Sequence, residues 1–364
     1  MESPLEALAD IQVKHPRLLI VSAVLITMVL AAGIPRIQLQ TDFQSSLPDS
    51  IPAVQTQDKV NARFGSSDAI IILFQTDKQP VKDSFVTDVR DPRLIRTQAF
   101  LAKQLEKEPN VESVRSPSSF FPQGVPDTEQ GVKQVLANTQ SGVFFNRDYT
   151  ASLMYVQMTG DMNEENIREA TATINNDISQ TPMYPGVKTT ITGLPVIRTD
   201  IGDILVSDSF TTIAAASILI LILLVLTRGR VYGPITFIPL FVGLIWTLGA
   251  MGLLGIPLTI ATIALGSMIL GLGVEYGSFI TERILEETEE FGVDQAVRDA
   301  IPTTGLAILG SSSTTVIGFS ALLIASISFI RNLGLTLALG ISLTLSAALV
   351  LTPALIVEYE RWSE

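Results

Sequence analysis

Six long apolar segments constrain the fold of this chain more than any other feature. A helix needs about 20 apolar residues to cross a bilayer, and it satisfies every backbone hydrogen bond within its own segment. Charged residues make up only 16% of the 364 residues, against roughly 25% in a soluble domain. The sequence therefore predicts a polytopic α-helical membrane protein with six transmembrane helices. The predicted spans cover Leu18–Ile34, Phe210–Thr227, Gly233–Leu254, Pro257–Ile280, Thr303–Ala325 and Leu333–Val357.

Lysine and arginine in the short loops predict the orientation of these spans. Basic residues are concentrated in cytoplasmic loops, and here nearly all of them fall on one side if the spans alternate. We therefore expect both termini in the cytoplasm and the chain in the plasma or inner membrane. The predicted cytoplasmic side carries Lys14, Arg17, Arg228, Arg230, Arg283 and Arg298, whereas the opposite short loops carry Arg331.

The long segment between the first two spans, residues 36–207, is expected outside the membrane as one folded domain. Its predicted strands alternate with helices, and two strand–helix–strand units of this size indicate a ferredoxin-like α+β domain. The predicted strands are AIIILF, VESVR, TASLMYVQM and KTTIT, and the predicted helices are RLIRTQAFLAKQLEKE, 128–136 and 163–178.

The rest of the chain divides around this domain. Residues 1–35 are a cytoplasmic tail with the first span, and residues 208–364 hold the other five spans. Within that bundle the cytoplasmic loop 281–301 has the pattern of an amphipathic helix, and we expect it to connect two spans while lying on the membrane surface. Its apolar face would consist of Ile284, Leu285, Phe291, Val297 and Ile301.

Composition excludes several classes of function. The chain has no cysteine and a single histidine, His15, so thiol chemistry, a histidine-based metal site and a histidine-based catalytic triad are excluded. A net charge of -12 argues against a nucleic-acid partner, because nothing here would neutralise a run of phosphates. We expect no enzyme activity, no metal and no cofactor.

One ionisable side chain stands out in the fourth predicted span. Glu275 is the only charged residue between Leu258 and Ile280, and Tyr276 follows it. An ionised carboxylate in hydrocarbon costs about 2.5–3.5 kcal/mol on insertion scales, and such residues commonly mark proton or ion paths. The alternative is a purely structural carboxylate near the membrane boundary or bonded to a neighbouring helix. Glycines that would let helices pack closely around it are Gly271, Gly273 and Gly277.

A run of hydroxyl side chains, SSSTT, lies within the fifth predicted span. We expect these hydroxyls to bond to their own helix backbone or across a helix contact, with a share in a proton path as the alternative. The residues concerned are Ser312, Ser313, Thr314 and Thr315.

Several motifs, in order along the chain, resemble the RND superfamily, and specifically its MMPL-like lipid and hydrophobe exporters. In that group, spans two to six also resemble sterol-sensing domains. VKHPRLLI resembles the lead-in to the first span, TDFQSSLP with ARFGSSDAIIILF the entry to the ectodomain, and TGLPVIRTDI its exit. GLGVEYG followed by ERILEE resembles the fourth-span signature, while GFSALLIAS and LTPALI resemble the last two spans.

This resemblance implies efflux of a hydrophobic, lipid-like or amphiphilic substrate, driven by the proton gradient as proton antiport. It places a proton relay at Glu275 and Tyr276, with Glu where the family usually has Asp. It also implies an RND porter-like ectodomain. Family members usually contain two six-span halves and this chain has one, so a homodimer is expected, with a trimer as the alternative. If the fourth spans face each other, Glu275 of one chain could meet Tyr276 of the other.

Two other functions remain open from the sequence. SecD and SecF, accessory subunits of protein secretion, also have six spans, an ectodomain after the first span and a related fourth-span motif. A lipid-binding or lipid-sensing membrane protein without pumping is the other alternative. The retained ionisable residue at position 275 favours transport over sensing.

Overall fold

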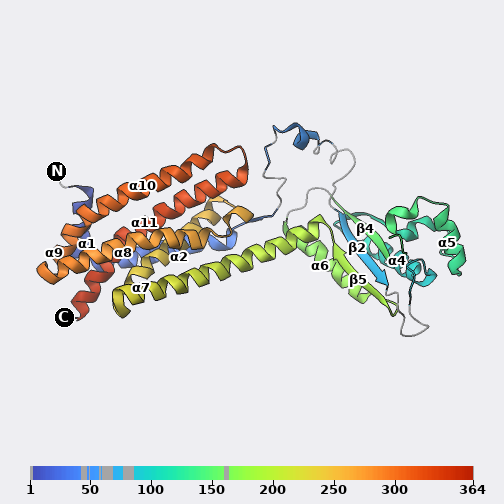
Figure 1. Cartoon of the computed structure of the whole chain (residues 1–364), viewed down its shortest axis with the longest axis horizontal. Helices are drawn as coiled ribbons and strands as arrows, with labels where there is room; N and C mark the ends of the chain where they lie inside the picture. The colour runs from blue at the N-terminus through green and yellow to red at the C-terminus, as the bar shows by residue number, and fades with distance from the viewer. Residues whose placement is uncertain are drawn as a thin grey trace. The chain divides into compact units, whose positions relative to one another are not determined.

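The computed structural model describes residues 3–41, 47–48, 50–56, 59, 69–76, 86–159 and 164–363. They form two compact units, a helical one from Met1–Pro48 with Asp203–Glu364, and an α/β one from Asp49–Gly202. Figure 1 shows both units, coloured along the chain. Most of the TDFQSSLP and ARFGSSD motifs lies outside the described residues.

Within the described residues, five stretches of helix are long and apolar enough to cross a membrane. They are Pro16–Arg36, Leu194–Leu254, Ile260–Phe291, Val293–Ile324 and Ser328–Ser363. This confirms a predominantly helical chain with several candidate membrane spans. The helices and strands of this unit are α1 (Pro4–Lys14), α2 (Pro16–Ala31), η1 (Ile34–Arg36), β1 (Leu39–Gln40), α7 (Leu194–Leu254), β6 (Leu258–Thr259), η5 (Ile260–Thr262), α8 (Leu265–Phe291), α9 (Val293–Ala300), η6 (Ile301–Gly305), α10 (Leu306–Ser320), η7 (Ala321–Ile324) and α11 (Ser328–Ser363).

Helix α7 contains the second and third predicted spans. Its 61 residues would extend about 90 Å at 1.5 Å per residue, roughly three times the hydrocarbon thickness. The helix is broken at Gly229, whose φ of 83° and ψ of 176° are not helical. Beyond the break the chain doubles back on itself. The close approach of its two limbs shows this, since a Cβ on Gly233 would lie 2.8 Å from the Val225 Cα. Within the helical unit, the two limbs, 203–228 and 230–254, therefore pack side by side.

The fourth predicted span differs from the observed helix at both ends. Helix α8 begins at Leu265 rather than Pro257, because the preceding residues form β6, which pairs in parallel with β1, and the turn η5. Thr259 and Thr262 satisfy each other's backbone and side-chain groups there, with the Thr259 N–H donating to Thr262 Oγ1 at 2.7 Å. At the other end α8 continues past Ile280 to Phe291.

The predicted amphipathic loop 281–301 is helical. It comprises the last part of α8, a break at Gly292 with φ of 79°, and α9. Ile284, Val297 and Ile301 are completely buried, while Phe291 is exposed. The buried members of this apolar face pack against α1 and the bundle in one cluster, while Phe291 stays outside it.

The segment before the first span is an ordered helix rather than a tail. Helix α1 begins with a reciprocal capping box between Ser3 and Glu6. Its Ala9 and Val13 pack with residues of α8, α9 and α11 in one buried cluster. Helix α1 therefore closes the bundle at the end where α8 meets α9.

A buried glutamine joins α1 to the last helix. Gln12 is completely buried, and its Nε2 donates to the Leu349 carbonyl oxygen at 2.7 Å. In an α-helix that carbonyl would accept from the N–H four residues later, which here is Pro353. Proline has no N–H. The glutamine therefore supplies the donor that the proline in α11 removes.

The α/β unit contains a four-stranded antiparallel sheet. Its strand order is β3-β4-β2-β5. Along the chain β2, α4 and β3 precede β4, α6 and β5, and the strands occur where the sequence predicted them. The elements are β2 (Ala69–Thr76), α4 (Pro92–Leu105), β3 (Val111–Arg115), η3 (Pro117–Phe120), α5 (Glu129–Ala137), η4 (Ser141–Phe144), β4 (Ala151–Met158), α6 (Glu164–Gln180) and β5 (Val187–Thr192).

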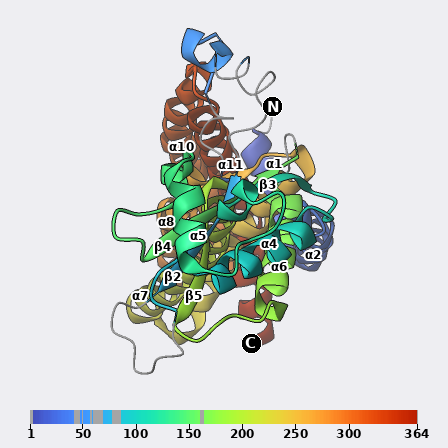
Figure 2. The ribbon, with the colours of Figure 1, turned by 90° about the vertical axis from the view of Figure 1, so that its right-hand side faces the viewer.

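Buried and less buried side chains alternate along the strands, and this alternation shows which face of the sheet is covered. In β2 the side chains of Ile70, Ile72 and Phe74 are completely buried, and their neighbours are not, as expected where successive side chains point to opposite faces. These residues share a core with apolar residues of α4 and α6. The two helices lie side by side (Figure 2), so both cover the same face of the sheet.

We predict that Gln12→Leu destabilises the chain by about 1–3 kcal/mol, because it leaves a buried carbonyl without a donor. In a Pro353→Ala background the restored N–H can bond to Leu349, so the same change should cost less. Thermal unfolding of the four full-length variants in one detergent measures this coupling. Strictly additive effects would contradict the proposed bond.

Candidate functional site

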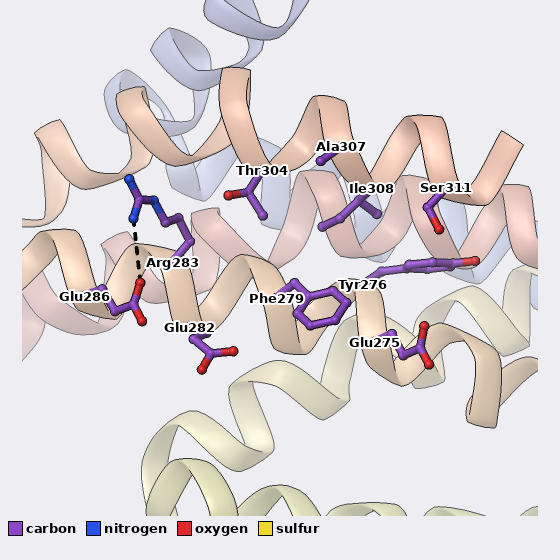
Figure 3. Close-up of a pocket in the computed structure, with 10 residues that line it drawn as sticks. All are labelled: Glu275, Tyr276, Phe279, Glu282, Arg283, Glu286, Thr304, Ala307, Ile308 and Ser311. Atoms are coloured by element: carbon purple, nitrogen blue, oxygen red, sulfur yellow. Dashed lines mark ion pairs between the residues drawn. The ribbon is translucent and has the colours of Figure 1, made fainter.

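The predicted relay residues line a hollow within the helical unit. Its volume is about 420 Å³, and it lies between α8 on one side and η6 with α10 on the other (Figure 3). Its mixture of acid, aromatic, hydroxyl and apolar side chains distinguishes it from a purely apolar gap between helices. The lining residues are Glu275, Tyr276, Phe279, Glu282, Arg283, Glu286, Thr304, Ala307, Ile308 and Ser311.

Glu275 and Tyr276 have opposite environments although they are neighbours in sequence. The Tyr276 side chain is buried, whereas Glu275 is exposed on the surface of the single chain. Figure 3 shows the phenol ring directed toward Ser311, and the carboxylate on the edge of α8 away from α10. Because Tyr276 is buried in its own chain, the face open to a second chain carries Glu275 and not the phenol. A direct contact between Glu275 and Tyr276 of two chains therefore does not follow from this geometry.

The three glycines around the relay differ in their surroundings. A Cβ on Gly273 would lie 2.6 Å from Thr344 Cγ2 on α11, and one on Gly277 would lie 3.1 Å from Thr236 Cγ2 on α7. Both glycines therefore permit α8 to approach its neighbours closely. Gly271 is exposed and faces open space in the single chain. Packing at Gly271 would need a partner from outside the chain.

Three threonines place hydroxyl groups on the buried side of α8. Thr236 and Thr281 share a hydrogen bond of 2.8 Å between their Oγ1 atoms. Thr344 is completely buried, and its Oγ1 has no hydrogen-bond partner among the described residues. Sequence reasoning missed these residues, because a threonine in an apolar helix usually bonds to its own backbone and gives no distinct signal.

The predicted hydroxyl run on α10 is mostly directed to its own helix. Ser312 and Ser313 donate to the Leu309 carbonyl, and Thr314 donates to that of Ser311. Thr315 lies at a long 3.5 Å from the same Ser311 carbonyl. The residue of the run that lines the hollow is Ser311. The sequence feature that could have indicated Ser311 is its spacing of seven residues from Thr304, because residues seven apart lie on the same face of a helix.

Charged groups gather at the end of the hollow away from Ser311. Arg283 pairs with Glu287 and, at 3.7 Å, with Glu286, the pair drawn in Figure 3. Glu282 pairs with Arg228 of α7 at 2.8 Å. Partly exposed ion pairs of this kind are found where water reaches the protein. The hollow therefore joins a charged end to the region of Glu275 and Tyr276.

The α/β unit has a hollow of its own, of about 420 Å³, beside α4. Arg93, Arg96 and the exposed ring of Phe100 line one side, and Tyr184 lines the other. The Arg93 guanidinium lies 5.4 Å from the centre of the Tyr184 ring, and its hydrogen bond to Asp91 raises the pKa of Arg93. Basic and apolar side chains therefore occur together here, with Arg93 paired to Asp91 and Arg96 to Asp127.

Comparison with known proteins gives a family and two relatives. A sequence model of the MMPL family matches residues 45–363. A protein of Methanocaldococcus jannaschii, whose name describes it as a membrane protein, is 32% identical over 339 residues, covering 91% of this chain and 87% of that protein. A Mycobacterium leprae protein named as the transport protein MmpL4 is 24% identical over 305 residues, covering 80% of this chain but 29% of that protein.

We predict that Gly273→Ala lowers stability by about 1–3 kcal/mol, because the added methyl group overpacks against Thr344. Gly310→Ala is the matched control, since Gly310 faces open space and alanine favours the helix by about 1 kcal/mol. Thermal unfolding of both full-length variants checks the difference. Equal effects would show that α8 is not held at the distance described.

Proposed function

The chain belongs to the MMPL family, and from this premise we propose that it is a proton-driven exporter of lipids or other hydrophobic or amphiphilic molecules. The observation that carries the proposal is the pair Glu275–Tyr276, which lies on an apolar helix long enough to span the membrane and lines the hollow beside it. Family membership favours export over a role as a SecD- or SecF-like subunit. The ionisable residue favours export over lipid sensing.

The physical basis is the unfavourable energy of a charge in hydrocarbon. An ionised carboxylate at the centre of a span raises the free energy of insertion by about 2.5–3.5 kcal/mol, and this penalty is smaller when the group is protonated or faces water. Glu275 is exposed on α8 and borders a hollow whose other end is charged. A proton that reaches Glu275 through this hollow would neutralise it, and its departure would restore the charge. Alternation between these two states couples proton movement to a change in helix packing.

The proposed topology has six spans. The two limbs of α7 on either side of Gly229 would each cross the membrane, which converts the five long helical stretches into six spans. With the basic residues of the short loops on the cytoplasmic side, both termini are cytoplasmic and the α/β unit is outside the plasma membrane. The strand order β3-β4-β2-β5 and the two helices on one face of the sheet support a ferredoxin-like fold for that unit. We assign it as the porter-like domain of the exporter.

The proposed working unit is a homodimer that meets along α8. The uncovered face of α8 carries Met268, Gly271, Glu275 and Phe279, spaced three or four residues apart, so they lie on one stripe of the helix. A second copy covering this stripe would remove Glu275 from lipid and fill the open space at Gly271. A closed dimer of this kind has a self-complementary interface.

We predict that Glu275→Gln abolishes proton-coupled transport while leaving folding intact, because the amide keeps the shape but cannot ionise. Glu275→Asp should retain reduced transport. The measurement is movement of a fluorescently labelled phospholipid in proteoliposomes with an imposed pH gradient, compared with protein-free vesicles. Glu289→Gln, on the exposed end of α8 outside the hollow, is the matched control. Transport by the Gln variant at the parent rate would make Glu275 structural.

For the dimer, we predict a mass in mild detergent of twice 39.3 kDa, plus bound lipid and detergent. Gly271→Phe should convert this species to a monomer, because the ring would occupy the space a second α8 needs. Gly310→Phe has equally open surroundings in the single chain and should leave the dimer intact. A parent monomer that still transports, or a stable trimer in lipid, would refute this arrangement.

A further inference from the structure

The two ends of the chain form a second hollow, of about 360 Å³, distinct from the one beside α8. It lies where α1 meets α2 and where α11 ends. The side chains that matter here are Lys14, Arg17 and Leu18 from the start of the chain and Glu358, Arg361 and Trp362 from its end. No stretch of sequence contains this group. Only the packing of the first and last helices brings it together.

Basic side chains predominate among the charged residues that line this hollow, although the chain as a whole is acidic. Three basic side chains face one carboxylate, whereas the chain carries a net charge of -12. Lys14 is paired with Asp10 at 3.0 Å, Arg17 with Glu358 at 2.8 Å and Arg361 with Asp294 at 2.9 Å. Exposed pairs of this kind contribute little, roughly 0–1 kcal/mol, and a guanidinium has five N–H donors. An anion with several acceptor oxygens can therefore bind without all of these pairs being broken.

An apolar track leads out of the hollow along α2. Leu18 is 66% exposed, and exposed apolar side chains continue at Val21, Leu25 and Met28, three or four residues apart on one face of the helix. In a span this face contacts lipid tails. The side chain of Arg17, immediately before the track, is 84% exposed. The change from cation to apolar surface marks the boundary between headgroups and hydrocarbon.

A tryptophan stands at the same level on the other side of the hollow. Trp362 is 81% exposed at the end of α11. Tryptophan is enriched at the membrane–water interface, where its amphipathic ring lies among the headgroups. Basic hollows between helices at this level are the kind of site that binds anionic headgroups.

We propose that this hollow binds the anionic phosphate headgroup of a membrane lipid, with one acyl chain along the exposed face of α2. Lys14, Arg17 and Arg361 contact the headgroup, and Leu18 begins the contact with the tail. A free phosphate shares the headgroup chemistry but would not use the apolar track, so the geometry favours the lipid. The bound lipid would hold the start of α2 against the end of α11. The site is separate from the relay and does not depend on transport.

The test measures binding of phosphatidylglycerol to the full-length chain in neutral detergent, by native mass spectrometry and by the rise in melting temperature. Phosphatidylcholine and inorganic phosphate are the comparison ligands. For the double variant R17Q/R361Q we expect the affinity for phosphatidylglycerol to fall roughly 25-fold, about fivefold for each basic residue near an anionic surface. Phosphatidylcholine binding should not change.

Two further variants separate a binding site from a structural role. Glu358→Gln removes the competing carboxylate and should tighten phosphatidylglycerol binding, although it also removes an ion pair. The control R230Q/R331Q removes the same charge from two arginines outside the hollow and should leave binding as it is. Unchanged binding in R17Q/R361Q, an equal loss in the control, or no tightening in E358Q would overturn the proposal. So would inorganic phosphate raising the melting temperature as much as phosphatidylglycerol does.

Discussion

The close approach of α8 to α7 and α11 is the contact on which the rest of the bundle depends. A Cβ on Gly273 would lie 2.6 Å from Thr344 Cγ2, and one on Gly243 would lie 2.5 Å from the Thr344 Cα. Larger residues at these places would push the helices apart. In lipid no hydrophobic force draws helices together, so such packing contacts hold the bundle.

This contact also sets the rotation of α8 about its own axis. With 3.6 residues per turn, placing Gly273 and Gly277 against neighbouring helices directs Tyr276 inward and Glu275 outward, as the burial of these two side chains shows. The relay proposed for this chain therefore has one buried hydroxyl group and one carboxylate on an uncovered face. Because the carboxylate lies on this uncovered face, its protonation depends on what covers the face, whether lipid or a second copy of the chain.

The ends of the chain form a second centre of organisation. A proline in α11 leaves a carbonyl without its usual donor, and Gln12 of α1 supplies one. Ion pairs join the same regions, with Arg17 bonded to Glu358 and Arg298 bonded to Asp10. Helix α1 thus joins the last helix to α9 through Gln12 and Asp10, and Arg17 of α2 binds the end of the last helix. The charged hollow proposed as a lipid site is a product of this arrangement.

Sequence by itself determined the membrane class, the apolar helices and the strands of the α/β unit, because these depend on local composition and periodicity. It also determined that Glu275 is the unusual residue, since a charge in an apolar run is visible without any structure. The start of α8 at Leu265 was not predictable in this way. There the local apolar run is interrupted by the pairing of β6 with β1, a contact between residues more than 200 apart in the chain.

Only the tertiary structure decided which polar groups accompany the carboxylate. The hydroxyls of Ser312 and Ser313 donate to their own helix, whereas Ser311 lines the hollow. The Thr344 hydroxyl lies against Gly273 with no hydrogen-bond partner in the described part of the chain. Sequence places each of these groups on a helix, but their distances depend on how three helices rotate and pack. The same holds for the chain ends, where Arg17 and Arg361 line one hollow. Periodicity describes one helix at a time, and a site is built from side chains of several.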